Sequence, residues 1–228
     1  MIGTVLLGFV LLFALSAVFL DAKGSDRGSR ISAILAGLAA VGASAVLFAV
    51  ILSNDFSYSY VASYSSIDLP LIYKISAFWA GQQGSFLLWL LIHALVGTYM
   101  VCTNRLTATG RIIYHLLTAM LVILVFIKSP FAPAEHIMPD GYGMNPLLQD
   151  PWMAVHPPII FIGYALLAVP FVYSLESMMR SPADGNFLAP MRRWTLIAWS
   201  FLGAGIFIGG YWAYKVLGWG GYWGWDPV

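Results

Sequence analysis

The first twenty residues, MIGTVLLGFVLLFALSAVFL (residues 1–20), contain no charged side chain. A helix needs about 20 consecutive apolar residues to cross the hydrocarbon core of a bilayer, and this stretch meets that length. It lacks the basic start and the small-residue cleavage site of a secretory signal peptide. We therefore expect a retained membrane-spanning helix here, and similar segments recur along the chain.

The composition indicates the same environment for the whole chain. Of its 228 residues, 60% are hydrophobic and only 9% are charged, whereas soluble domains average about 25% charged residues. The mean hydropathy is +0.81, and the formal net charge of +1 argues against nucleic acid as a partner. The single cysteine, Cys102, excludes an internal disulfide and a CxxC redox pair. These features predict an integral membrane protein.

Six apolar segments predict an all-α, polytopic membrane helix bundle with about six transmembrane helices. We interpret residues 1–228 as a single transmembrane domain. The predicted spans cover about residues 2–20, 31–52, 83–102, 112–127, 157–179 and 194–214.

The charges of the connecting loops predict the orientation of the bundle. Loops 21–30, 103–111 and 180–193 carry eight basic residues, whereas loops 53–82, 128–156 and 215–228 carry three. Because cytoplasmic loops are enriched in Lys and Arg, we expect the first set in the cytoplasm and both termini on the outer, periplasmic side. The cytoplasmic loops are also short, so we expect any site on the outer face, formed by loop 128–156 and loop 215–228.

The terminal loop contains GWGGYWGWDPV, residues 218–228, in which three tryptophans alternate with glycines. Tryptophan and tyrosine also anchor proteins at membrane interfaces, but anchoring does not require glycine. Glycine lets the backbone approach a ligand closely, and aromatic faces stack on flat apolar surfaces. The pattern therefore favours a binding site for a large planar ligand over interfacial anchoring. Its residues are Trp219, Gly220, Gly221, Tyr222, Trp223, Gly224, Trp225 and Asp226.

His156 is the second candidate site residue, in the sequence HPP (residues 156–158). Proline is tolerated in the first turn of a helix, so we expect His156 just before the fifth span, at the outer surface and level with the terminal loop. A neutral imidazole is a good ligand for haem iron. The alternative is that the imidazole caps the helix or bonds a nearby carbonyl group.

Three ordered stretches resemble one protein family. WGGYWGWDPV (219–228) is similar to the tryptophan-rich WWD signature of haem-handling membrane proteins. WAGQQGSFLLW (79–89) and NPLLQDPWMAVHPP (145–158) resemble elements of one branch, the CcmF-type cytochrome c haem lyases. The CcmC-type haem exporters also have six spans, but their WWD signature lies in the middle of the chain, so that branch fits less well.

The resemblance implies a haem-binding site at the outer face. Residues 219–226 would bind the haem, and His156 would be an axial ligand of its iron. In the family, the second external histidine and both histidines that hold a membrane-embedded b-type haem lie beyond the WWD segment, where this sequence has ended. The resemblance therefore implies that these ligands belong to a partner polypeptide, if the protein is naturally split, or to a missing part of the same protein.

The function implied by the resemblance is c-type cytochrome biogenesis. The chain would be a haem lyase subunit that holds haem for thioether attachment to a CxxCH apocytochrome, in the cytoplasmic membrane of a prokaryote with its site facing the periplasm. The implied partners are the remaining half of the lyase, a CcmE-type haem chaperone, a CcmH-type apocytochrome-presenting protein and apocytochrome c. The alternatives are a haem transporter or exporter, a haem-binding subunit without lyase activity, and an aromatic-rich structural subunit of an ion-translocating complex.

Three further polar residues have no assigned role. Gln83 stands where the family commonly has glutamate, which puts a charge-pairing role there in doubt. His93 falls within the third predicted span, where it either bonds across helices or marks a functional site. His136, in the outer loop, is either an ordinary loop residue or an additional ligand.

Overall fold

The computed structural model describes residues 2–136, 138–179 and 187–216. Within these ranges, six helices are long enough and apolar enough to cross a membrane. They are α1 (Ile2–Ala22), α2 (Asp26–Leu52), α5 (Gln82–Cys102), α6 (Ala108–Ile127), α7 (Pro151–Met179) and α8 (Leu188–Val216). The described residues form no β-strand, so the predicted all-α bundle with six spans is confirmed.

Four helices begin earlier than hydropathy predicted. α2 begins at residue 26 rather than 31, α6 at 108 rather than 112, α7 at 151 rather than 157 and α8 at 188 rather than 194. Hydropathy marks the part of a helix that lies in hydrocarbon, whereas these helices begin in segments that were assigned to the flanking loops. The start of α7 at Pro151 is compatible with helix geometry, because the N–H that proline lacks has no intrahelical partner at that position.

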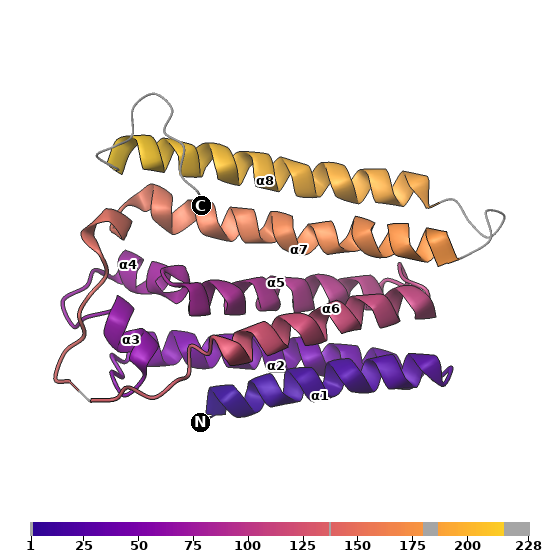
Figure 1. Ribbon diagram of the computed structural model, residues 1–228, viewed down its shortest axis with the longest axis horizontal. Helices are drawn as coiled ribbons and strands as arrows, with labels where there is room; N and C mark the ends of the chain where they lie inside the picture. Colours follow the sequence, from indigo (N-terminus) through magenta and orange to yellow (C-terminus); the bar gives the residue numbers. More distant parts are fainter. Residues whose placement is uncertain (1, 137, 180–186, 217–228) are drawn as a thin grey trace.

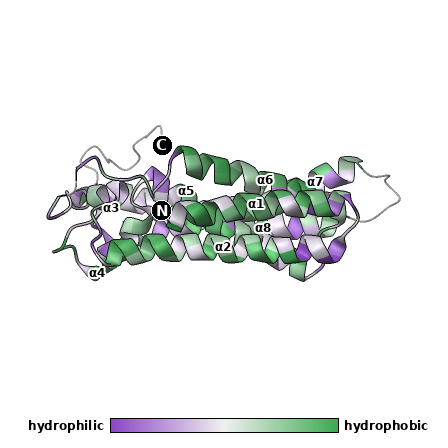
Figure 2. Ribbon diagram, turned by 90° about the horizontal axis from the view of Figure 1, so that it is seen from below, coloured by the Kyte–Doolittle hydropathy of each residue, from purple (hydrophilic) through white to green (hydrophobic). Residues whose placement is uncertain are grey.

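The long helices run up and down beside one another (Figure 1). α5 lies at the centre in contact with α2, α6 and α7, and α1 packs on α2 and α6. α8 packs along α7 at the opposite edge. The start of α1 and the end of α8 lie at the same end of the bundle, as expected for an even number of spans. Hydrophobic residues dominate the long helices, and hydrophilic residues gather toward their ends (Figure 2).

At one end of the bundle the connections are short, and a buried ion cluster joins three helices. Arg111 on α6 donates to Asp21 of α1 from Nε at 2.9 Å and from Nη2 at 2.5 Å, and it also pairs with Asp26 of α2. Ser29 donates to the second Asp21 oxygen at 2.6 Å. The sequence placed Arg111 in a loop, but it lies in the first turn of α6 with its side chain buried.

The opposite end carries a cap of short helices, where the sequence predicted only loop 53–82. These are α3 (Ser59–Tyr64), α4 (Leu71–Ser76) and the 3-10 turn η1 (Ala77–Trp79). The Tyr60 hydroxyl donates to the carbonyl oxygens of Ala77 and Phe78 at 2.9 and 3.0 Å, and it accepts the Gly81 N–H at 3.1 Å. One buried hydroxyl therefore ties α3 to the turn that enters α5.

The chain between α6 and α7 lies across this cap along an irregular path. It includes the 3-10 turn η2 (Pro146–Leu148). Its backbone pairs with α3, since the Ser59 N–H donates to the Ala132 carbonyl at 3.0 Å and the Tyr142 N–H to the Ala62 carbonyl at 2.8 Å. As a result, α7 begins at the same end of the bundle at which α8 ends.

Candidate functional site

His156 lies inside α7, which corrects the prediction that it precedes the helix. α7 begins five residues earlier, and the helix continues through Pro157 and Pro158. The cause is Asp150, whose carboxylate accepts the Trp152 N–H at 2.9 Å. An aspartate that accepts a backbone N–H two positions ahead stabilises a helix start. The predicted outer loop 128–156 therefore ends at residue 150, and His156 is held on a helix rather than on a loop.

The His156 ring packs against Trp212 of α8. The two ring centroids lie 5.7 Å apart and the planes are tilted by only 21°. Gly209 makes this approach possible, because a Cβ at that position would lie 2.9 Å from His156 Nδ1. Nδ1 is buried and has no hydrogen-bond partner among the described residues. The imidazole is thus positioned by aromatic packing and not by a hydrogen bond.

A second aromatic pair lies beside the first. Trp152 of α7 and Tyr211 of α8 meet edge to face, with ring centroids 5.1 Å apart. The indole N–H of Trp212 donates to the Leu147 carbonyl at 3.3 Å. These contacts join the loop before α7 to the last turns of α8, so the surroundings of His156 are fixed from two helices and a loop.

An ion pair links the same two helices. Lys215 Nζ of α8 donates to Asp150 Oδ2 at 2.8 Å, while the other carboxylate oxygen of Asp150 caps α7. Sequence analysis treated these two residues only as loop charges and missed their pairing. The available signal was their position, because Asp150 precedes His156 by six residues and Lys215 directly precedes the tryptophan-rich stretch.

The tryptophan-rich stretch itself lies outside the described residues. This applies to Trp219, Gly220, Gly221, Tyr222, Trp223, Gly224, Trp225 and Asp226, whose role as a haem site stays a prediction. The predicted loop 215–228 starts later than expected, because Lys215 and Val216 belong to α8. The first tryptophan of the stretch, Trp219, follows the last residue of α8 by three positions.

The WAGQQGSFLLW element forms the turn that enters α5. Gly81 precedes the helix in an extended conformation, and Ser85 donates to the Trp79 carbonyl at 2.9 Å. A Cβ at Gly84 would collide with the Phe78 carbonyl and the Tyr60 hydroxyl. This packing accounts for the glycines of the element. Gln83 lies partly exposed in the first turn of α5.

The other two candidate histidines lie apart from His156. His93 is buried in α5, where its Nε2 lies 3.1 Å from the Thr118 hydroxyl of α6 and its ring stacks on Tyr114 at 4.3 Å. This is the hydrogen bond across helices that the sequence offered as one interpretation. His136 is exposed in the loop between α6 and α7.

The family model described as cytochrome C assembly protein matches residues 79–228. The chain is 36% identical to the cytochrome c-type biogenesis protein CcmF of Escherichia coli, over 97% of this chain and 36% of that protein. It is 37% identical to CcmF of Pseudomonas aeruginosa over all of this chain and 37% of that protein. It is 38% identical to the cytochrome c-type biogenesis protein ccl1 of Rhodobacter capsulatus, over 84% and 30% respectively.

A solved structure has the same arrangement of helices. The structure is named cytochrome c haem lyase CcmF; it superposes with a TM-score of 0.83 at 30% identity and covers 99% of this chain but 38% of its own. The chain thus spans a little over a third of the length of these relatives. The family match covers well over half of the chain. It includes all of α7 and α8, the two helices that carry His156 and Trp212. The chain belongs to the cytochrome c assembly protein family and corresponds to part of a CcmF-like protein.

Proposed function

We propose that this chain takes part in c-type cytochrome biogenesis as a haem lyase subunit that holds haem at the outer end of the bundle. The observation that carries the proposal is the His156–Trp212 pair. It lies near the end of α8, and the tryptophan-rich stretch follows α8 directly in the sequence. The family name and the names of the relatives agree with this role.

The ring of His156 suits a role as a haem-iron ligand. Nδ1 faces Gly209 and is enclosed by α8, so Nε2, on the far side of the ring, is the nitrogen available to a ligand. Packing against Trp212 fixes the ring plane. A fixed, neutral imidazole binds iron without first giving up a hydrogen bond. Trp219, Trp223 and Trp225 then supply flat apolar surfaces for the porphyrin.

The reaction needs no nucleophile from this chain. Each thioether forms when a cysteine S–H of the CxxCH acceptor adds across a vinyl C=C bond of the haem, so the substrate carries the reacting thiol. The contribution of the protein is to hold the haem edge in reach of the thiols and to set the electronic state of the iron through its axial ligand. His156 performs the second task directly.

The remaining portion of the lyase packs on the free face of α8. This helix is much less buried than the other five, and Trp199 and Phe207 are 68% and 79% exposed. Gly203 leaves open space on this helix, which allows another helix to approach closely. The relatives are nearly three times as long as this chain, and their remaining length supplies the second external histidine and the b-type haem ligands.

The proposed partners and location follow from the same role. A CcmE-type chaperone delivers haem, a CcmH-type protein presents the apocytochrome, and apocytochrome c is the acceptor. The membrane is the cytoplasmic membrane of a prokaryote, with the His156 end of the bundle facing the periplasm. The excess of basic residues in the short loops at the opposite end supports this orientation.

A haem exporter is less well supported. Moving haem through the bundle requires a polar or open path between the helices. The buried His93 instead lies within hydrogen-bond distance of Thr118 and stacks on Tyr114, so this polar side chain serves a contact between helices. A haem-binding subunit without lyase activity would bind haem normally but leave the apocytochrome unmodified.

The decisive experiment replaces His156 with alanine in the chain co-expressed with the remaining lyase portion. We expect holocytochrome c to fall at least tenfold and the haem absorption spectrum of the purified complex to change, with partial recovery when imidazole is added. His136→Ala is the matched control, because His136 is an exposed histidine in the loop before α7. Normal maturation and an unchanged spectrum in His156→Ala would refute the assignment, whereas normal haem binding by the wild type without any maturation would favour the subunit that only binds haem.

A further inference from the structure

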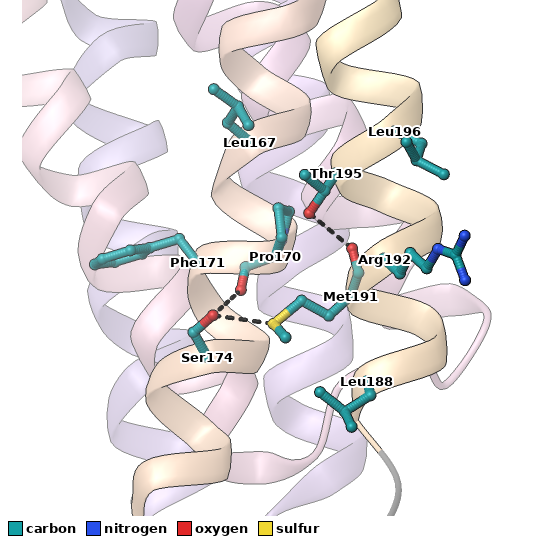
Figure 3. A pocket seen from close by; sticks show the side chains of 9 residues that line it. All are labelled: Leu167, Pro170, Phe171, Ser174, Leu188, Met191, Arg192, Thr195 and Leu196. Atoms are coloured by element: carbon teal, nitrogen blue, oxygen red, sulfur yellow. Dashed lines mark hydrogen bonds between the residues drawn. The ribbon is translucent and has the colours of Figure 1, made fainter.

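A groove of about 550 Å³ runs between α7 and α8 near the end of the bundle with short connections. Its walls are largely apolar and come from both helices (Figure 3). The apolar side chains that line it are Leu167, Pro170, Phe171, Leu188, Met191 and Leu196. Phe171, Leu188 and Leu196 are about half exposed or more, so the groove is open along its side.

The hydroxyl groups of the groove are satisfied within the protein. Ser174 donates to the Pro170 carbonyl at 2.9 Å and to the Met191 sulfur at 3.1 Å, and Thr195 donates to the Met191 carbonyl at 2.8 Å. Figure 3 shows Met191 directed toward Ser174, while Arg192 extends away from that contact. Arg192 is thus the polar group of the groove that is left to meet a ligand at its rim.

The rim is positively charged. Arg192 lines the groove, and its neighbour in the sequence, Arg193, is also exposed. Neither forms an ion pair within the described ranges. Arg105 lies over the Tyr99 ring at 5.8 Å, and Tyr99 in turn meets Trp194 of α8 edge to face at 6.3 Å. Three arginines and two interfacial aromatic residues therefore gather at this end of α8.

Among the described residues, no acidic side chain pairs with Arg192 or Arg193. Glu176 is the acid of α7 near the groove, and its side chain is fully buried, where it accepts a hydrogen bond from Thr107. Asp21 and Asp26 are engaged by Arg111 on the far side of the bundle. An apolar groove below a basic rim matches a molecule with a hydrocarbon chain and an anionic head.

We propose that the α7–α8 groove binds an anionic phospholipid, with its phosphate at Arg192 and Arg193 and one acyl chain along the groove. Basic pockets between transmembrane helices recognise anionic head groups, and Trp and Tyr lie at head-group depth. A polypeptide helix in the groove would have to bring its own acidic residue to the rim. This site is independent of the haem site at the opposite end of the bundle.

The first experiment measures lipid retention by native mass spectrometry of the purified chain in a neutral detergent. We expect one molecule of dioleoyl phosphatidylglycerol to be retained and dioleoyl phosphatidylcholine to bind at least tenfold more weakly. Arg192→Gln with Arg193→Gln should weaken phosphatidylglycerol retention about 25-fold, at about fivefold per charge. Arg27→Gln with Arg30→Gln is the matched control, because these arginines start α2 at the same end but on the other side of the bundle. Equal losses in the two double variants would overturn the proposal.

A second variant tests the acyl-chain part. Thr195→Phe places a ring in the groove at an exposed position, so it should leave the fold intact. We expect it to weaken dioleoyl phosphatidylglycerol several-fold more than the dihexanoyl lipid, whose chains are too short to fill the groove. If Thr195→Phe weakens the binding of neither lipid, the groove does not hold an acyl chain.

A third measurement distinguishes lipid from protein in intact membranes. A photoreactive amino acid in place of Leu196 is expected to crosslink to phospholipid. A crosslink to polypeptide instead would show that another helix occupies the groove, and the proposal would be wrong.

Discussion

The Asp21–Arg111 cluster and the His156–Trp212 pair lie at opposite ends of the bundle. They differ in whether their buried polar atoms have hydrogen-bond partners. In the cluster, Arg111 donates to two carboxylates and Ser29 completes the contacts of Asp21. In the pair, the buried Nδ1 of His156 has no partner in the described part of the chain. A buried polar group without a partner costs free energy. The same packing that encloses Nδ1 leaves Nε2, on the far side of the ring, for a ligand.

The difference separates residues that hold the helices together from residues that are kept available. The cluster joins α1 to α2 and α6, on which α1 packs. The pair joins α7 to α8, at the edge where α8 is largely uncovered. Substitutions in the cluster should therefore act on stability, and substitutions in the His156–Trp212 pair should act on haem chemistry with little effect on stability.

The largest effect is expected for Arg111→Leu. It leaves the Asp21 carboxylate, which is 5% exposed, buried without its cation, and breaking a buried pair in this way costs about 3–5 kcal/mol. We expect a large fall in the thermal unfolding temperature of the detergent-solubilised protein.

The control for that variant is Arg27→Leu, whose side chain is exposed at the start of α2. It should leave the unfolding temperature nearly unchanged. If both variants unfold alike, the cluster does not hold the three helices together and the contrast between the two ends fails.

The next effect is expected for Tyr60→Phe in the cap. It removes hydrogen bonds to the Ala77 and Phe78 carbonyls and from the Gly81 N–H, which should cost about 1–3 kcal/mol. Tyr142→Phe is the control, since Tyr142 is 79% exposed. The comparison of these two variants tests whether the end of the bundle that carries His156 also contains stabilising contacts apart from the His156–Trp212 pair.

The same variant has a defined dependence on pH. Burial raises the pKa of the Tyr60 phenol above its ordinary value of 10.0. A group whose pKa is higher in the folded state contributes stability that is complete below the unfolded pKa and is lost as pH rises above it. The difference in unfolding free energy between wild type and Tyr60→Phe should therefore be constant from pH 6 to 9 and shrink above about pH 10. A difference that grows above pH 10 would contradict the burial of the hydroxyl.

The spans could be predicted because each is a long apolar segment whose charge-poor centre is visible in the sequence. The start of α7 could not, because it depends on Asp150 capping the Trp152 N–H, and aspartate before proline is equally typical of a turn. His156 was found through its HPP sequence and the family resemblance. Its partner Trp212 was not assigned, because a contact between α7 and α8 follows from packing and leaves no periodic signal.

Gly209→Ala sharpens the comparison at the His156 end. The new Cβ would lie 2.9 Å from Nδ1 and 3.2 Å from Cε1 of His156, so the ring must move by a few tenths of an ångström. Helix propensity favours alanine by about 1 kcal/mol, so the net change in stability should be within about 1 kcal/mol. We expect a shifted haem absorption spectrum and a several-fold loss of cytochrome maturation.

Gly210→Ala is a closely matched control for that variant. Gly210 is the next residue of the same helix, and a Cβ there would have no neighbour within 4 Å in the described structure. It should leave the spectrum and the maturation yield unchanged. If the two alanine variants behave alike, the close approach of Gly209 to the imidazole has no functional meaning.

The smallest effect is expected at the Asp150–Lys215 pair. Substitutions there should change the position of the end of α8 without changing the stability of the protein. Lys215 is half exposed, and exposed ion pairs contribute little to stability, so Lys215→Gln should leave the unfolding temperature unchanged. The pair nevertheless fixes the end of α8 against the start of α7, six residues before His156. We expect a two- to threefold loss of maturation in Lys215→Gln and recovery in Lys215→Arg, because arginine also reaches the Asp150 carboxylate. A loss that the arginine variant fails to recover, or a loss that tracks the unfolding temperature, would show that the last turn of α8 is not positioned by this charge.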